Sequence, residues 1–115
     1  MKVLLKRVGE CPRFIDIPNE YESFKELLDG EPTAAPAYIN HVVVVSDKDF
    51  KKKQLNYKNE SKNLNGSFDV TGDAIFVTYK HIIFESITED DADRVVEHYF
   101  PEYAEEYRLR GKRGL

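Results

Sequence analysis

Two parts of this chain, one early and one late, follow the same plan of two short strands and then an acidic amphipathic helix. In the early part, the spacing of apolar residues predicts strands at Lys2–Val8 and Arg13–Ile17 and a helix at Asn19–Leu28. The late part comprises predicted strands at Asp73–Tyr79 and Ile82–Ile87 and a helix at Thr88–Phe100. Most of the patterned residues are needed to build these elements, which leaves few for chemistry.

Both predicted helices carry start signals. Asn19 is a good N-cap with Glu22 three residues on, and Gly30 provides a stop after the early helix. Thr88 caps the late helix with Asp91 at the third position. Apolar residues at i, i+3, i+4, i+7 and i+8 of the late helix are Ala92, Val95, Val96, Tyr99 and Phe100. This spacing predicts a face that packs on the sheet.

The middle of the chain contains the clearest buried strand, Tyr38–Val45, whose four consecutive valines make both faces apolar. The stretch Glu31–Pro36 is predicted as a loop, and Phe50–Gly66 as one short edge strand with a long mobile loop. Together these elements predict an α+β fold: a largely antiparallel β-sheet of four to six strands with two amphipathic helices packed on one face. The residues expected to be buried together are Val43, Val45, Phe76, Val95 and Tyr99.

The chain has 115 residues, of which 41% are apolar and 33% charged, as expected for one globular domain. We expect a single α+β domain over residues 1–107, followed by a basic C-terminal tail over 108–115. The longest apolar run is Val42–Val45, so we expect no membrane span and no signal peptide. Cys11 is the lone cysteine, which fits a reducing compartment and predicts a cytoplasmic location, in the host cell if the protein is phage-encoded.

The net charge of −4 hides a strong segregation of charge. Residues 85–106 contain nine acids against Arg94, whereas residues 47–62 contain six lysines against three acids. The tail adds four positive charges between Arg108 and Arg113. A mostly acidic body argues against general nucleic-acid binding, because that affinity grows with the number of phosphates neutralised. The two basic patches could still steer one partner.

The sequence holds no recognisable catalytic or metal-binding pattern. His41, His81 and His98 lack the short spacings of zinc ligands, and Cys11 sits in a predicted turn before Pro12 without a supporting motif. The glycines are too far apart for a phosphate-binding loop. We therefore predict that the protein is not an enzyme, has no catalytic residues and needs neither metal nor cofactor.

An acidic strip on the late helix is the first candidate surface. Its residues are Glu89, Asp90, Asp93 and Glu97. Carboxylates in a first helical turn stabilise the helix dipole, and this ordinary role is the favoured interpretation for the cluster at its start. The alternative is that the strip contacts a basic partner surface or mimics nucleic acid.

A lysine-rich segment is the second candidate. Lys51, Lys52 and Lys53 lie close to Tyr57, a combination able to bind phosphate and stack on a base. The tail residues Arg108 and Arg110 would complete this ligand site in an oligomer, or would bind the acidic strip of a neighbouring copy. The simpler interpretation is that the lysines protect a sheet edge against aggregation.

Several segments also resemble a known family. Phe24–Gly30, Val42–Asp47, Gly72–Val77 and Phe84–Asp90 match, in order, the pattern of an uncharacterised family named for a domain of unknown function, number 3846. The family is common in phages and conjugative elements, so the resemblance implies a mobile-element origin and supplies no catalytic residues. On this basis we expect a small accessory protein that binds and inhibits a host protein, such as a component of a defence system. The alternative is sequestration of a nucleotide or another small phosphorylated ligand.

Overall fold

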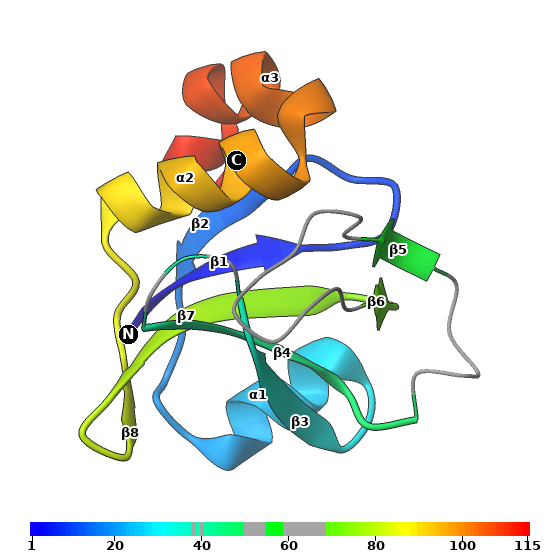
Figure 1. The fold of residues 1–115 in the computed structure, drawn as a ribbon, viewed down its shortest axis with the longest axis vertical. Helices are drawn as coiled ribbons and strands as arrows, with labels where there is room; N and C mark the ends of the chain where they lie inside the picture. Colours follow the sequence, from blue (N-terminus) through cyan, green and yellow to red (C-terminus); the bar gives the residue numbers. More distant parts are fainter. Residues whose placement is uncertain (38, 40, 50–54, 59–68) are drawn as a thin grey trace.

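In the computed structural model, residues 1–37, 39, 41–49, 55–58 and 69–115 are described. A six-stranded antiparallel sheet forms its centre (Figure 1). Five strands follow the order β2-β1-β7-β4-β3, and the sixth, β8, pairs with β7 on the same edge as β1. Its strands are β1 (Lys2–Lys6), β2 (Arg13–Asp16), β3 (Pro32–Pro36), β4 (Val42–Asp47), β7 (Ala74–Lys80) and β8 (Ile83–Glu85). A separate two-stranded sheet is formed by β5 (Leu55–Lys58) and β6 (Asp69–Thr71). The predicted α+β class with a largely antiparallel sheet is confirmed.

The helices lie on both faces of the sheet, so the prediction of two helices on one face was wrong. Helix α1 (Tyr21–Leu28) lies on one face, and α2 (Glu89–Tyr99) and α3 (Ala104–Leu109) lie on the other (Figure 1). The reason is the alternation of side chains along each strand. On β7, Ile75 and Val77 pack in the cluster that contains Phe24 of α1, whereas Phe76 packs with the residues of α2.

The expected core set is divided between these two layers. Val43 and Val45 pack on the α1 side, while Phe76, Val95 and Tyr99 form part of the cluster on the α2 side. The ring centroid of Phe76 lies 5.7 Å from that of Tyr99. Odd and even positions of β4 point to opposite faces, so consecutive valines enter different clusters. All the residues named are buried or half-buried, but not together.

The segment predicted as a loop at Glu31–Pro36 forms the edge strand β3, and its prolines explain why. The Ala37 amide donates to the Val42 carbonyl (2.9 Å) and the Lys48 amide donates to the Glu31 carbonyl (2.7 Å). Because main-chain groups alternate in direction along an antiparallel strand, residues 33 and 35 also face β4. The outward-facing positions are then Pro32, Ala34 and Pro36, of which only Ala34 has an N–H. Proline is compatible with an edge strand at such positions.

These prolines should block strand addition at the β3 edge. We expect the double substitution Pro32→Val/Pro36→Val to increase concentration-dependent self-association, because it restores two outward N–H donors. Light scattering against protein concentration measures this effect. The matched control is Ala35→Val, which raises strand propensity on the same strand without adding an outward donor. Equal association of the double variant and the control would contradict this role of the prolines.

The helix starts agree with prediction in one case and differ in the other. Thr88 Oγ1 accepts a hydrogen bond from the Asp91 amide (3.1 Å), which confirms the predicted cap of α2. The N-cap position of α1 is Glu20, not Asn19, and no side-chain hydrogen bond caps this helix. The Asn19 amide group instead donates to the Phe84 carbonyl (3.2 Å) and so ties the start of α1 to β8.

The last part of the chain packs on the domain. A 3-10 turn, η2 (Pro101–Tyr103), leads into α3, and a second, η3 (Gly111–Arg113), lies against β2. Gly111 is buried there, and a Cβ at this position would overlap the Pro12 carbonyl oxygen. The segment 108–115, expected as a tail, therefore contributes to the covering of the β2 edge.

Candidate binding surfaces

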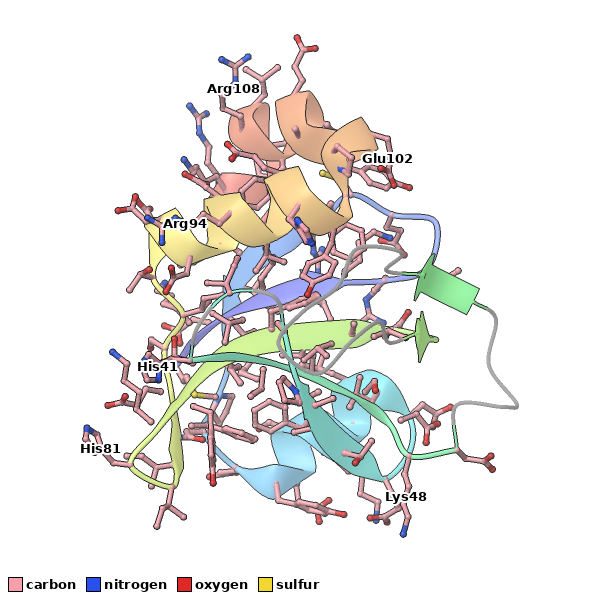
Figure 2. The ribbon with its side chains drawn as sticks, in the orientation of Figure 1. His41, Lys48, His81, Arg94, Glu102 and Arg108 are labelled. Atoms are coloured by element: carbon pink, nitrogen blue, oxygen red, sulfur yellow. The ribbon has the colours of Figure 1, made fainter. Side chains whose placement is uncertain are left out.

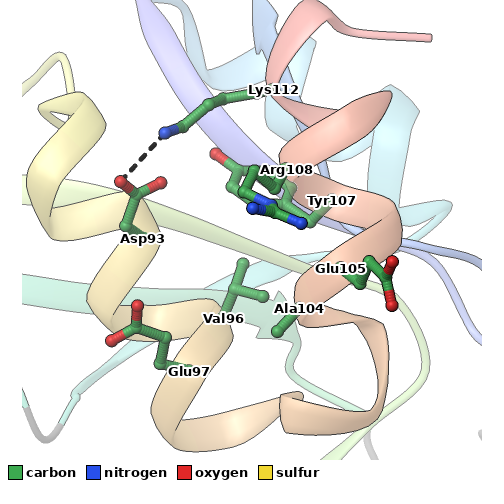
Figure 3. A pocket seen from close by; sticks show the side chains of 8 residues that line it. All are labelled: Asp93, Val96, Glu97, Ala104, Glu105, Tyr107, Arg108 and Lys112. Carbon is green, nitrogen blue, oxygen red and sulfur yellow. Dashed lines mark hydrogen bonds and ion pairs between the residues drawn. The ribbon is translucent and has the colours of Figure 1, made fainter.

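A groove of about 490 Å³ separates α2 from α3 and η3 (Figure 3). Asp93, Val96 and Glu97 of α2 form one wall. The other residues that line it are Ala104, Glu105, Tyr107, Arg108 and Lys112. The volume lies within the range of small-molecule sites in proteins. This groove brings together Asp93 and Glu97 of the acidic strip and Arg108 of the predicted ligand site.

An ion pair joins the two walls of this groove. The Lys112 ammonium lies 3.0 Å from the Asp93 carboxylate, and both side chains are about one-third exposed (Figure 3). The basic tail therefore contacts the acidic strip of its own chain. Next to the pair lies Tyr107, a buried residue whose hydroxyl has no hydrogen-bond partner in the described part of the chain.

The remaining predicted site residues lie apart from the groove or outside the described structure. Glu89 and Asp90 are exposed in the first turn of α2, where they stabilise the helix dipole. Arg110 pairs with Glu106 at 3.3 Å. Lys51, Lys52 and Lys53 lie outside the described residues, and Tyr57 belongs to β5. Arg108, in contrast to these residues, lines the groove, and it points away from the sheet at the surface of α3 (Figure 2).

A second groove, of about 370 Å³, lies on the α1 face and is largely apolar. Its lining comprises Asn19, Glu20, Tyr21, Phe24, Pro32, Thr33, Ala34, Val45 and Phe84. Phe84 is central, since its ring centroid lies 5.4 Å from that of Phe24 and 5.6 Å from that of Tyr79. Tyr79 is 42% exposed and Tyr21 is 53% exposed. An apolar surface thus continues from the groove toward the β7–β8 hairpin.

The turn of this hairpin exposes an unusual residue. Ile82 is 85% exposed and has a φ of 70°, in the left-handed region that β-branched residues avoid. His81 beside it also has a positive φ, of 54°. Ile83 is a further exposed apolar side chain. A turn between Tyr79 and Ile82 follows from the predicted strands, but Ile82 was predicted to begin the second strand, whereas it lies in the turn and β8 begins at Ile83.

The α1-face groove has an acidic rim. Glu20 lines it, Glu22 is exposed on the first turn of α1, and the Glu31 carboxylate accepts a hydrogen bond from the Tyr21 hydroxyl. Lys25 pairs with Glu31 at 3.4 Å and offsets part of this charge. The surface combines apolar and aromatic side chains with negative charge.

Comparison with known families places most of the chain in one described family. The family model for a domain of unknown function (DUF3846) matches residues 1–100. This chain belongs to the DUF3846 family. No curated protein and no solved structure matches it significantly. The family resemblance expected from the sequence is therefore confirmed over β1 to α2, and the α1-face groove lies wholly within the matched residues. Helix α3, one wall of the other groove, lies beyond them.

In this DUF3846 protein the histidines and the cysteine do not form a metal centre. Within the described residues, no three His, Cys, Asp or Glu side chains are placed to hold a metal ion. His41 and His81 lie at the surface on turns (Figure 2), and His98 packs edge-on against Tyr99. Burial, with Glu106 nearby, raises the pKa of the Cys11 thiol to about 11, so it remains protonated at neutral pH. A protonated thiol is a poor nucleophile.

One buried charge of the DUF3846 domain was not predicted. Lys6 of β1 is almost fully buried, and its ammonium donates to the Arg7 carbonyl (2.6 Å). It also lies over the rings of Phe100 (5.3 Å) and Tyr103 (4.9 Å), and burial lowers its pKa. This lysine joins the sheet to the segment after α2.

Among the helices described, none is long and apolar enough to cross a membrane.

Proposed function

We propose that this DUF3846 protein is a non-enzymatic binding module that docks a partner protein on its α1 face. We further propose that it is a phage or mobile-element accessory protein, and that its partner is a host protein, such as a defence component, that it inhibits. The mobile-element setting rests on the family resemblance. The docking surface rests on exposed apolar residues that folding alone does not require.

The observation that carries the proposal is the apolar surface formed by Tyr21, Phe84 and Tyr79, together with Ile82, which is exposed in the turn of the same β7–β8 hairpin. Helix α1 has eight residues and covers only part of its face of the sheet, so these side chains stay accessible. Ile82 is the most informative of them, because a left-handed conformation costs a non-glycine residue about 1–2 kcal/mol. An exposed and strained isoleucine contributes nothing to the core, which supports a role in contact with a partner.

The negative charge around this surface indicates the charge of the partner segment. Glu20 lines the apolar groove and Glu31 is bonded to Tyr21 of its lining, so a complementary segment carries lysine or arginine beside its apolar side chains. The outward prolines of β3 leave too few N–H groups for the partner to add as a strand. A basic amphipathic helix, which binds through its side chains, fits both conditions.

Selection from a displayed library of random 16-residue peptides tests this proposal. We expect the enriched peptides to combine apolar residues at helical spacing with lysine or arginine. The variants Tyr79→Ser and Ile82→Asn should weaken binding of an enriched peptide by about 1–2 kcal/mol or more each, as for hot-spot residues. Asparagine tolerates a positive φ better than isoleucine and adds no charge that would attract a basic peptide, so Ile82→Asn should keep the fold and test the apolar contact alone.

The matched control is Leu109→Ser. Leu109 is 58% exposed on α3, on the other side of the molecule, so its replacement removes an exposed apolar side chain outside the proposed surface. Peptide affinity should be unchanged in this variant. Acidic enriched peptides, no enrichment, or equal losses in all three variants would contradict docking on the α1 face.

A further inference from the structure

The exposed apolar side chains of this protein gather on two surfaces. In the described part of the chain, six large apolar residues are exposed. Four of them belong to α1 and the β7–β8 hairpin, which form the docking surface proposed above: Tyr21, Tyr79, Ile82 and Ile83. The other two, Leu109 and Leu115, lie at the end of α3 and just after η3. The protein therefore has a second exposed apolar surface, away from the α1 face.

This second surface is basic, and we call it the C-terminal surface: Leu109, Leu115 and the basic residues of 108–115. The Leu115 amide donates to the Arg110 carbonyl (3.3 Å), which brings the residue after η3 back to the end of α3. Residues 108–115 contain four basic side chains and no acidic one. Two of the four are paired within the chain. Arg108 and Arg113 are exposed and make no ion pair in the described part of the chain.

The C-terminal surface has the chemistry that the α1 face requires of an occupant. The α1 face combines apolar and aromatic side chains with the carboxylates of Glu20 and Glu31. The C-terminal surface presents leucine beside arginine on short helical segments, so it can bind through side chains without adding a strand at β3. Helices α1 and α3 lie on opposite sides of the sheet, so the two surfaces of one molecule cannot meet (Figure 1).

We propose that the C-terminal surface of one molecule docks on the α1 face of a second copy. This inference rests on the docking role proposed above for the α1 face and names a second occupant for it. The contact joins two different surfaces, so a pair of molecules keeps one free surface of each kind, and association continues into short chains or closes into a ring. Because one face receives both occupants, a second copy and the partner protein exclude each other.

Analytical ultracentrifugation of the full chain tests this proposal. Few apolar side chains meet in such a contact, so it is weak, and the weight-average mass should rise between about 10 μM and 1 mM protein. Ile82→Asn alters only the α1 face and Leu109→Ser only the C-terminal surface. Both residues are exposed, so both variants should fold, and each alone should associate about tenfold more weakly than the wild type.

An equimolar mixture of the two variants is the decisive sample. The Ile82→Asn chain supplies an intact C-terminal surface and the Leu109→Ser chain supplies an intact α1 face. The mixture should therefore regain the wild-type affinity but stop at a dimer of one chain of each kind, because the remaining free surfaces are the altered ones. A saturating basic peptide from the library selection should return the wild type to the mass of a monomer.

Charge reversal provides a matched pair of variants. Arg113→Glu should weaken self-association by about tenfold or more, because it places a carboxylate opposite the acidic rim of the α1 face. Arg94→Glu makes the same change in net charge on α2, outside both surfaces, and should alter the affinity by less than about twofold.

Self-association is overturned if the wild type keeps the mass of a monomer up to about 1 mM, or if the mixture of variants associates no better than either variant alone. It is also overturned if one of the two variants alone associates as the wild type does, because the contact would then be symmetric or would use another surface. Leu109→Ser separates this inference from the proposed function, since it should lose self-association and still bind the selected peptide. A monomeric wild type that binds basic peptides overturns self-association alone, whereas the absence of both overturns docking on the α1 face as well.

Discussion

Val95→Asp is expected to unfold this domain. Val95 has no exposed surface and belongs to the cluster formed by α2 and one face of the sheet. A carboxylate placed there has no cation among the apolar residues of that cluster, and a buried unpaired charge costs several kcal/mol. A cost of this size is comparable with the whole free energy of unfolding of a small domain at the lower end of the usual range, about 5 kcal/mol. Circular dichroism during heating should show no cooperative transition.

The matched variant Val95→Ala separates loss of volume from burial of charge. It removes two methyl groups from the same site and should lower the free energy of unfolding by about 1–3 kcal/mol while keeping a cooperative transition. If Val95→Asp melts cooperatively at the wild-type temperature, α2 does not pack on the sheet as described.

Gly111→Ala should give the second largest loss, because this glycine lies where two segments approach closely. An added Cβ would overlap the Pro12 carbonyl oxygen and would lie 2.6 Å from Cδ1 of Tyr107. A main-chain oxygen cannot rotate away, so η3 must move off β2. We expect a loss of about 1–3 kcal/mol, as for other overpacked sites, measured by urea unfolding.

Gly9→Ala is the control for glycine replacement itself. Gly9 has a φ of 75° and no neighbouring atom within 4 Å of an added Cβ, so only backbone strain of about 1 kcal/mol is expected. Gly111→Ala should also change hydrogen exchange in α3, because Tyr107 lies at the contact, whereas Gly9→Ala should not. A smaller loss for Gly111→Ala than for Gly9→Ala would mean that η3 is not held against β2.

The strands and the α2 cap could be predicted because their signals are local. The hairpin of β1 and β2 follows from apolar spacing around a turn, and Thr88 forms the predicted cap. The placement of helices on both faces was also indicated by the four consecutive valines of β4, since a strand apolar on both faces needs both faces covered. The prediction of both helices on one face would have left the second apolar face of β4 uncovered.

The binding surfaces were harder to predict because they depend on distant contacts. Asp93 and Lys112 meet only because η3 folds back along β2, and Tyr107 becomes buried for the same reason. The surface around Phe84 is assembled from α1, β3 and β8, which no local pattern connects. The prolines of β3 suggested a loop because their compatibility with an edge depends on which main-chain groups face β4.

The two edge strands of the central sheet, β3 and β2, are protected from pairing with another chain in different ways. At β3 the outward positions of Pro32 and Pro36 cannot donate hydrogen bonds, whereas at β2 the neighbouring chain segment η3 supplies the cover. The first protection is present as soon as the residues are synthesised, but the second exists only after the chain has folded back. During folding, therefore, β2 is the edge through which nascent molecules would aggregate, and docking of η3 is the step that ends this exposure.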